Sequence, residues 1–274
     1  MKQIIPLIIA YAAAFAAGFG GLALLRYFLK KRGKKIRLFA YIALSLLLSL
    51  TLCLGATAVY LSIHYSPDAA AEKALKGSDR VEVTHIDGAY FFDGPSDDAE
   101  LVFYPGAKVD AEAYAPLLSR LAEDGIDCFL LEMPFRLAIL DTNAADKVLD
   151  KYDYGCVMVS GHSMGGVAAS NYAAEHGNVD GLVLLASYPS KEIGGSVSVL
   201  SIYGSRDGVL DSGAYSSAKS KLPDNSAELV IEGGNHAQFG NYGKQFGDND
   251  ADISAEEQQR QTAEAILALK IRIA

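Results

Sequence analysis

The chain has 274 residues, half of them apolar, and a formal net charge of −9 at pH 7. Its length allows one large hydrophobic core, and its acidic balance disfavours nucleic acid as a partner. The charge is uneven, because residues 1–64 contain eight Lys or Arg and no Asp or Glu. The rest of the chain therefore carries 16 of the 24 basic and all 33 acidic side chains. The two parts are expected to lie in different environments.

Two long apolar runs occupy residues 4–29 and 38–63. Each is longer than the roughly 20 residues that an α-helix needs to cross a bilayer. The segment between them, residues 30–37, holds six Lys or Arg, and basic loops remain on the cytoplasmic side. The pattern predicts a transmembrane helical hairpin over residues 1–65, embedded in the cell membrane, with the rest of the chain on the extracytoplasmic side.

A cleaved signal sequence is the alternative interpretation of the second run. Ala56-Thr57-Ala58 resembles the small-residue site at which signal sequences are cut. The run is long for the apolar core of a signal, however, and another hydrophobic segment precedes it. These two features favour the hairpin.

The cysteines are too few, at these spacings, to form a disulfide framework. Cys53 lies in the second apolar run, and Cys128 and Cys156 lie in predicted strands. All three are expected to be small buried side chains.

A connector, residues 66–80 with a short helix at 69–75, leads to a predicted domain over residues 81–274. Short apolar runs bounded by turn residues predict strands at residues 81–86, 89–92, 101–104, 126–132, 156–159, 181–185, 197–203 and 227–231. Helices are expected between them at residues 111–124, 143–152, 164–176, 212–221 and 254–271. One hairpin followed by this alternation predicts an α/β fold with a mostly parallel, doubly wound sheet. Functional sites in such sheets gather at the carboxyl ends of the strands.

A G-x-S-x-G motif, from Gly161 to Gly165, joins the strand at 156–159 to the helix at 164–176. Gly161 and Gly165 leave room for a sharp turn, so Ser163 is expected at its tip in a strained conformation. The N-terminus of the following helix would present backbone N–H groups to an oxyanion at the same place. An ordinary strand-turn-helix is the alternative, but the context favours Ser163 as a nucleophile.

A nucleophilic serine needs a base, and residues 66–274 contain four histidines. His85 lies on the first hairpin and His176 at the end of a helix. His162 is a turn residue whose side chain is expected to point away from the serine pocket. His236 follows the last strand in a glycine-rich loop, at the edge of the sheet where Ser163 lies. His236 is therefore the predicted base.

The acid that orients the base must lie on a loop at the carboxyl end of another strand. Asp207 lies just past the strand at 197–203, in a turn flanked by glycine, and is the predicted acid. An aspartate that only bonds its own turn is the alternative interpretation. Glu132, at the end of an earlier strand, is the second candidate for the acid.

No metal site is predicted. Asp248, Asp250 and Asp252 alternate as in a calcium loop, but the glycine and the terminal glutamate of that pattern are missing. A solvated loop is the expected structure of this segment.

The order Ser163, Asp207, His236 is that of the α/β-hydrolase superfamily, which residues 81–271 resemble. More narrowly, residues 103–110, Met133-Pro134 and residues 236–243 are similar to a bacterial, often membrane-tethered, dienelactone-hydrolase-like branch. Ala107 stands where that resemblance leads us to expect a second glycine.

The resemblance implies a membrane-anchored serine hydrolase that cleaves a small-molecule carboxylic ester, a lipid ester or a lactone without a cofactor. Ser163 would attack the carbonyl, His236 would transfer the proton, and Asp207 would hold the imidazole. The backbone N–H groups of Met164 and Ala107 would form the oxyanion hole. An acyltransferase using the same triad and a non-catalytic binding protein that retains the fold are the two alternatives.

Overall fold

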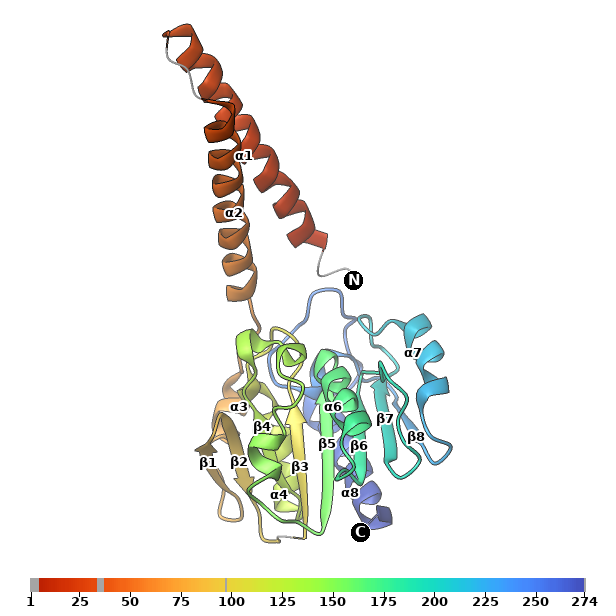
Figure 1. Cartoon of the computed structure of the whole chain (residues 1–274). Coiled ribbons are helices and arrows are strands. Elements are labelled where there is room, and N and C mark those ends of the chain that lie inside the picture. Colours follow the sequence, from red (N-terminus) through yellow and green to blue (C-terminus); the bar gives the residue numbers. More distant parts are fainter. Residues whose placement is uncertain (1–4, 34–36, 97, 274) are drawn as a thin grey trace. The chain divides into compact units, whose positions relative to one another are not determined.

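The computed structural model describes residues 5–33, 37–96 and 98–273. The chain divides into two compact units, Met1–His64 and Tyr65–Ala274 (Figure 1). Residue 4, with which the first apolar run begins, and residues 34–36 of the basic segment lie outside the described residues.

The first unit consists of two long helices, α1 (Ile5–Lys31) and α2 (Leu38–Ser62), which lie side by side (Figure 1). Gly18 allows their close approach, because a Cβ atom there would lie 2.1 Å from the Ser49 hydroxyl oxygen. The hydroxyl groups of Tyr11 and Thr57 form a 2.6 Å hydrogen bond between the helices. By length and composition both helices could cross a membrane. They fit the predicted hairpin.

The second unit is built on one eight-stranded sheet with the strand order β1-β2-β4-β3-β5-β6-β7-β8. The strands are β1 (Glu82–Ile86), β2 (Ala89–Asp93), β3 (Ala99–Tyr104), β4 (Asp127–Leu131), β5 (Cys156–His162), β6 (Gly181–Leu185), β7 (Ser198–Gly204) and β8 (Ala227–Ile231). β1 pairs antiparallel with β2, and β2 pairs antiparallel with β4; every other pair is parallel. The predicted hairpin followed by a mostly parallel sheet is confirmed.

Helices cover both faces of this sheet (Figure 1). The longer ones are α4 (Ala115–Glu123), α6 (Met164–Glu175), α7 (Ser212–Ala218) and α8 (Ala255–Ile273), and the short ones are α3 (Ala69–Ala74), η1 (Ala111–Tyr114), η2 (Pro134–Arg136), η3 (Ala138–Leu140), α5 (Asp146–Leu149), η4 (Lys219–Lys221) and η5 (Ala237–Phe239). Buried side chains of α4 and α8 form one hydrophobic cluster with the sheet, and those of α5 and α6 form a second. The sheet is therefore the middle layer between two cores.

Three predicted helices differ from the observed ones. The helix expected at 212–221 divides into α7 and the short 3₁₀ helix η4. The helix expected at 111–124 divides into η1 and α4, because Pro116 has no N–H group and favours the first turn of a new helix. The helix expected at 143–152 is a single turn, α5. Asn143 and Asp150 flank that turn, and short polar side chains of this kind compete with helical hydrogen bonds.

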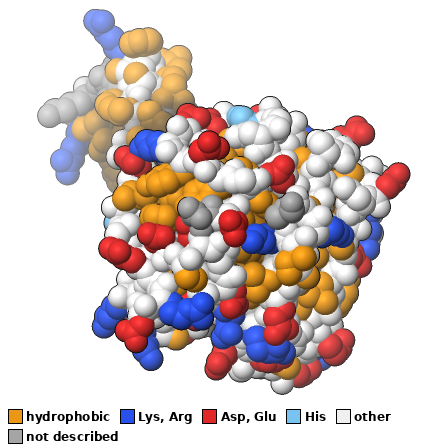
Figure 2. Space-filling view, turned by 90° about the horizontal axis from the view of Figure 1, so that it is seen from below, with side chains coloured by type: hydrophobic (Ala, Val, Ile, Leu, Met, Phe, Trp, Pro, Cys, Tyr) orange, Lys and Arg blue, Asp and Glu red, His pale blue; other side chains and the backbone are white. Residues whose placement is uncertain are grey.

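The chain enters the second unit next to the loop that follows β3. Tyr65 pairs with Val109, its N–H donates to the carbonyl of Lys108 at 2.7 Å, and its carbonyl accepts from Asp110 N–H at 2.9 Å. The amino ends of β3 and β4 lie at the opposite edge of the sheet. Seen from that side, the surface carries both acidic and basic side chains, interspersed with hydrophobic ones (Figure 2).

Candidate active site

Three predicted residues lie on loops at the carboxyl ends of strands. Ser163 directly follows β5 and precedes α6, Asp207 lies three residues after β7, and His236 lies five residues after β8. Because β5 to β8 are parallel neighbours, these loops all emerge at the carboxyl-terminal end of the sheet.

Ser163 occupies a sharp turn between β5 and α6. Its backbone has φ 54° and ψ −119°, a conformation that is rare for any residue other than glycine. A Cβ atom at Gly161 would lie 2.4 Å from the backbone of Gly165, and one at Gly165 would lie 2.1 Å from the carbonyl oxygen of Tyr104. Only glycine fits at either position, so the turn has the geometry that the motif predicts.

Asp207 and His236 form a buried pair. The Nδ1 atom of His236 lies 2.8 Å from Oδ2 of Asp207, and the two side chains are 1% and 3% exposed. The other oxygen, Oδ1, accepts the N–H groups of Val209 and Leu210, each at 2.8 Å. The carboxylate is thus fixed by its own loop and in turn fixes the imidazole ring.

The second ring nitrogen of His236, Nε2, is buried and has no hydrogen-bond partner among the described residues. In the structure it therefore makes no hydrogen bond with Ser163. Such contacts are often long without substrate and shorten in the reactive complex. With Nδ1 committed to Asp207, Nε2 is the nitrogen that can accept a proton.

His162 lies in β5 and not, as predicted, in the turn. It is the last residue of β5, is 1% exposed, and its ring centre lies 4.6 Å from that of His236. Burial holds the pKa of His162 well below its ordinary value, so the ring is neutral. Its Nδ1 atom lies 2.8 Å from the hydroxyl of Tyr114, which also accepts the N–H of Gly106 at 3.0 Å. Since the hydroxyl oxygen accepts from Gly106, its hydrogen is available to His162.

The loop after β3 carries Ala107, one of the two predicted oxyanion donors. β3 lies beside β5, with Tyr104 opposite Gly161, and Gly165 touches the backbone of the same loop. The loop therefore lies against the start of α6, where the other predicted donor, Met164, begins the helix.

A family model described as the alpha/beta hydrolase family matches residues 100–260, which is more than half of the chain. The chain belongs to the alpha/beta hydrolase family.

Solved structures of related fold cover most of this hydrolase. TT1662 from Thermus thermophilus superposes with a TM-score of 0.53 at 15% identity, over 69% of this chain and 98% of its own. The alpha/beta hydrolase domain-containing protein 10 from mouse gives 0.51 at 11% identity, over 71% and 99%. A serine hydrolase involved in carbazole degradation gives 0.51 at 12% identity, over 69% and 98%. At these identities the likeness shows the fold alone.

A curated relative matches a shorter stretch of the hydrolase. A putative non-heme haloperoxidase of Mycobacterium phage D29 is 36% identical over 88 residues, which are 28% of this chain and 32% of that protein. The chain thus spans about a third of this relative's length. The matches do not distinguish the dienelactone-hydrolase-like branch from others, so that narrower resemblance stays a prediction.

Glu132, the second candidate for the acid of this hydrolase, has a different partner. Its carboxylate lies 2.8 Å from Nε2 of His85, and both side chains are about half exposed, at 42% and 50%. Glu132 follows β4, which lies on the far side of β3 from β5. Of the two predicted acids, Asp207 is the one that reaches His236.

The loop with Asp248, Asp250 and Asp252 is only partly the solvated segment that was expected. Asp250 pairs with Lys244, and both side chains are largely exposed, whereas Asp252 lies 3.4 Å from Arg206. Asp248, by contrast, accepts backbone N–H groups from two neighbouring loops. The sequence pattern alone could not separate these three aspartates.

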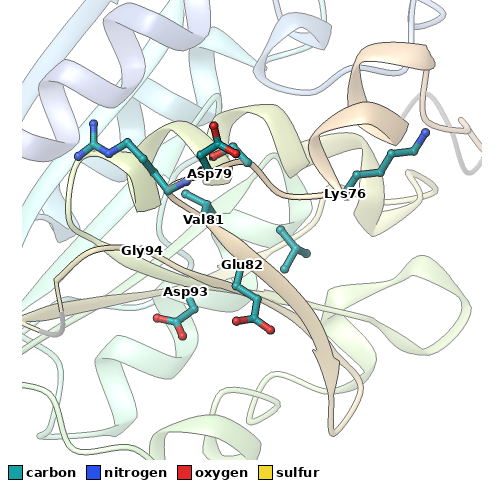
Figure 3. Close-up of a pocket in the computed structure, with 9 residues that line it drawn as sticks. Lys76, Asp79, Val81, Glu82, Asp93 and Gly94 are labelled. Carbon is teal, nitrogen blue, oxygen red and sulfur yellow. Dashed lines mark hydrogen bonds between the residues drawn. The ribbon is translucent and has the colours of Figure 1, made fainter.

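Figure 3 shows the residues that line a surface hollow. The hollow lies near the amino end of β4, at the opposite end of the sheet from the loops that carry Ser163, Asp207 and His236. It is formed at the start of β1 and the end of β2, where Glu82 and Asp93 are cross-strand partners. Its other lining residues are Lys76, Ser78, Asp79, Arg80, Val81, Val83 and Gly94. It contains none of the predicted site residues and carries both signs of charge, so we assign it no part in the chemistry.

Proposed function

We propose that this hydrolase is a membrane-anchored serine hydrolase that cleaves carboxylic esters, including lipid esters or lactones, through Ser163, His236 and Asp207. The observation that carries the proposal is the buried Asp207–His236 hydrogen bond at the edge of the sheet where Ser163 occupies its sharp turn. A turn aspartate with no catalytic role would not need a buried imidazole as its partner.

The geometry supports an acyl-enzyme mechanism. Ser163 Oγ attacks the ester carbonyl while Nε2 of His236 accepts its proton, and Asp207 stabilises the imidazolium that forms. The backbone N–H groups of Met164 and Ala107 hold the oxyanion. The imidazolium then protonates the departing alcohol. Water, deprotonated by His236, releases the acid and restores Ser163.

The membrane anchor rests on α1 and α2 and on the basic segment between them. Both helices are long and apolar enough to span a bilayer. Because basic loops remain cytoplasmic, the hydrolase unit would lie on the extracytoplasmic side. Protection of the hydrolase unit from added protease in inverted vesicles, but not in cells with a permeabilised outer layer, tests this orientation.

A fluorophosphonate probe and a series of p-nitrophenyl esters test the enzymatic proposal. The full chain in detergent should react with the probe and hydrolyse at least one ester, because His236 activates Ser163. Ser163→Ala should lose both properties while keeping the wild-type circular dichroism spectrum. A folded wild-type protein that the probe does not label would overturn the proposal.

A further inference from the structure

Asp248 connects the two loops that carry the predicted acid and base. Its Oδ1 atom accepts the N–H of Gly208 at 3.0 Å, and its Oδ2 atom accepts the N–H of Ala237 at 2.9 Å. Gly208 directly follows Asp207, and Ala237 directly follows His236. One carboxylate therefore holds the backbone immediately next to both members of the buried pair.

The two loops are also joined closer to their strands. Arg206 N–H donates to the carbonyl of Gly234 at 2.8 Å, and Gly233 N–H donates to the hydroxyl of Ser205 at 2.9 Å. Both of these bonds precede Asp207 and His236 in their loops. Asp248 supplies the connection on the other side, so each of the two residues lies between fixed points.

The segment that presents Asp248 is itself held in place. The side-chain amide of Asn235 donates to the carbonyl of Asn249 at 2.8 Å, and Asp252 N–H donates to the carbonyl of Gly233 at 2.7 Å. A Cβ atom at Gly208 would lie 2.8 Å from the carbonyl oxygen of Gly247. The carboxylate of Asp248 is thus an ordered acceptor rather than a side chain free in solvent.

We propose that Asp248 is a positioning residue of this hydrolase, which keeps the Asp207 and His236 loops in register while the imidazole gains and loses its proton. The proposal rests on the triad proposed above. A carboxylate suits the position because its two oxygens accept the N–H groups of Gly208 and Ala237 from the two loops, and Oδ1 also accepts the N–H of Asn249 at 2.9 Å. An asparagine would offer one oxygen and turn an NH₂ group towards the other donor.

Asp248→Asn, compared with Asp250→Asn, tests the proposal. Both changes remove one negative charge from the same loop, but Asp250 pairs only with the exposed Lys244 among the described residues. In Asp248→Asn we expect kcat per fluorophosphonate-reactive site to fall roughly 10- to 100-fold, because small displacements of catalytic groups have effects of that size. KM should change little, and Asp250→Asn should stay within about twofold of wild type.

The pH profile separates positioning from general loss of structure. If the Asp207–His236 bond loosens, the imidazolium loses stabilisation, and the acidic limb of kcat/KM should move to lower pH in Asp248→Asn. His162, the other titratable ring against His236, is neutral and common to all variants. If the variant were only less completely folded, kcat/KM would be lower at every pH, but the acidic limb would stay at the same pH.

The outcomes distinguish the two proposals. A wild-type protein that does not react with fluorophosphonate contradicts the triad itself. If the wild type reacts with fluorophosphonate and Asp248→Asn has the same kcat and the same acidic limb, the result contradicts the role of Asp248 but not the triad. Should the amide variant fail to fold, Asp248→Ala, which leaves both N–H groups to water, provides the same comparison.

Discussion

Tyr114 links the loop after β3 to His162, the residue before the proposed nucleophile. Its hydroxyl accepts the N–H of Gly106 and lies 2.8 Å from Nδ1 of His162, and the whole side chain is buried. Burial raises the pKa of this tyrosine well above its ordinary value, so the hydroxyl keeps its hydrogen. Because Ala107 follows Gly106, the bond holds the Pro105–Gly106 peptide, which directly precedes the peptide whose N–H is the proposed oxyanion donor.

Tyr114→Phe is expected to lower kcat roughly tenfold. The change leaves the Ala107 N–H in place but removes the partner of Gly106, so the loss should be smaller than the ~10²–10³ caused by deleting an oxyanion donor. Turnover of a p-nitrophenyl ester per labelled Ser163 measures the effect. Tyr242→Phe is the matched control, because it also removes a buried hydroxyl, one bonded to Gln245. Equal rates in the two variants would contradict the role of Tyr114.

The residues with proposed chemical roles were more predictable than those proposed to support them. Ser163, Asp207 and His236 each follow a strand that is recognisable as a short apolar run. In a parallel sheet the ends of these strands lie on the same side, so the three residues are expected to lie there together. Tyr114 and Asp248 have no such signal. Their contacts depend on how separate loops fold over one another, which neither spacing nor composition contains.

At the scale of elements, the start of α6 lies against the backbone at the end of β3. A Cβ atom on Gly165, in the first turn of α6, would lie 2.1 Å from the carbonyl oxygen of Tyr104 and 2.4 Å from that of Pro105. These are backbone atoms, which cannot move aside as the end of a flexible side chain could. The position of the Ser163 turn over the sheet therefore depends on this contact.

Gly165→Ala should displace α6 from the loop after β3. We expect the free energy of unfolding to fall by roughly 1–3 kcal/mol or more, which is the usual cost of overpacking a core. The labelling of Ser163 should be largely lost. Gly177→Ala is the control, since nothing lies within 4 Å of a Cβ there. Urea denaturation and probe labelling measure both effects, and wild-type labelling in Gly165→Ala would contradict the expectation.

Strands were predicted closely and helices less so. Buried parallel strands are largely apolar, and turn residues mark their ends, as in β6 and β7. Helix extents depend more on single residues. Pro116 divides the segment 111–124, and the polar residues around α5 leave one turn where three were expected.

At the scale of the whole molecule, a buried pair of carboxyl groups lies at the amino ends of β3 and β4, at the end of the sheet opposite Ser163. Glu100 and Asp127 are register partners on β3 and β4, and they are 1% and 2% exposed. Asp127 accepts the hydroxyl of Tyr154 and the N–H of Gly94. Burial, followed by the nearby Asp127 and Asp153, raises the pKa of Glu100 to about 8.

This pair makes stability depend on pH. In the unfolded chain Glu100 ionises near its ordinary pKa of 4.5, whereas the folded protein keeps the proton until about pH 8. Between these values the folded state binds the additional proton, so the free energy of unfolding falls as pH rises, and the loss is complete above about pH 8.

Glu100→Gln should flatten this dependence, because the amide does not ionise. Thermal melts from pH 5 to pH 8 should show a smaller decline in Tm than wild type shows. Glu82→Gln, which changes an exposed glutamate on β1, should keep the wild-type slope. Parallel slopes for wild type and Glu100→Gln would contradict the assignment.

The cysteines also bear on the molecule as a whole. Cys128 and Cys156 are buried as predicted, on the strands that flank β3, whereas Cys53 on α2 is partly exposed. Burial raises the pKa of both strand thiols and so lowers their reactivity. A maleimide reaches them only when the centre of the sheet opens. The rate at which these two thiols are alkylated therefore measures how often the native protein opens, without any engineered label.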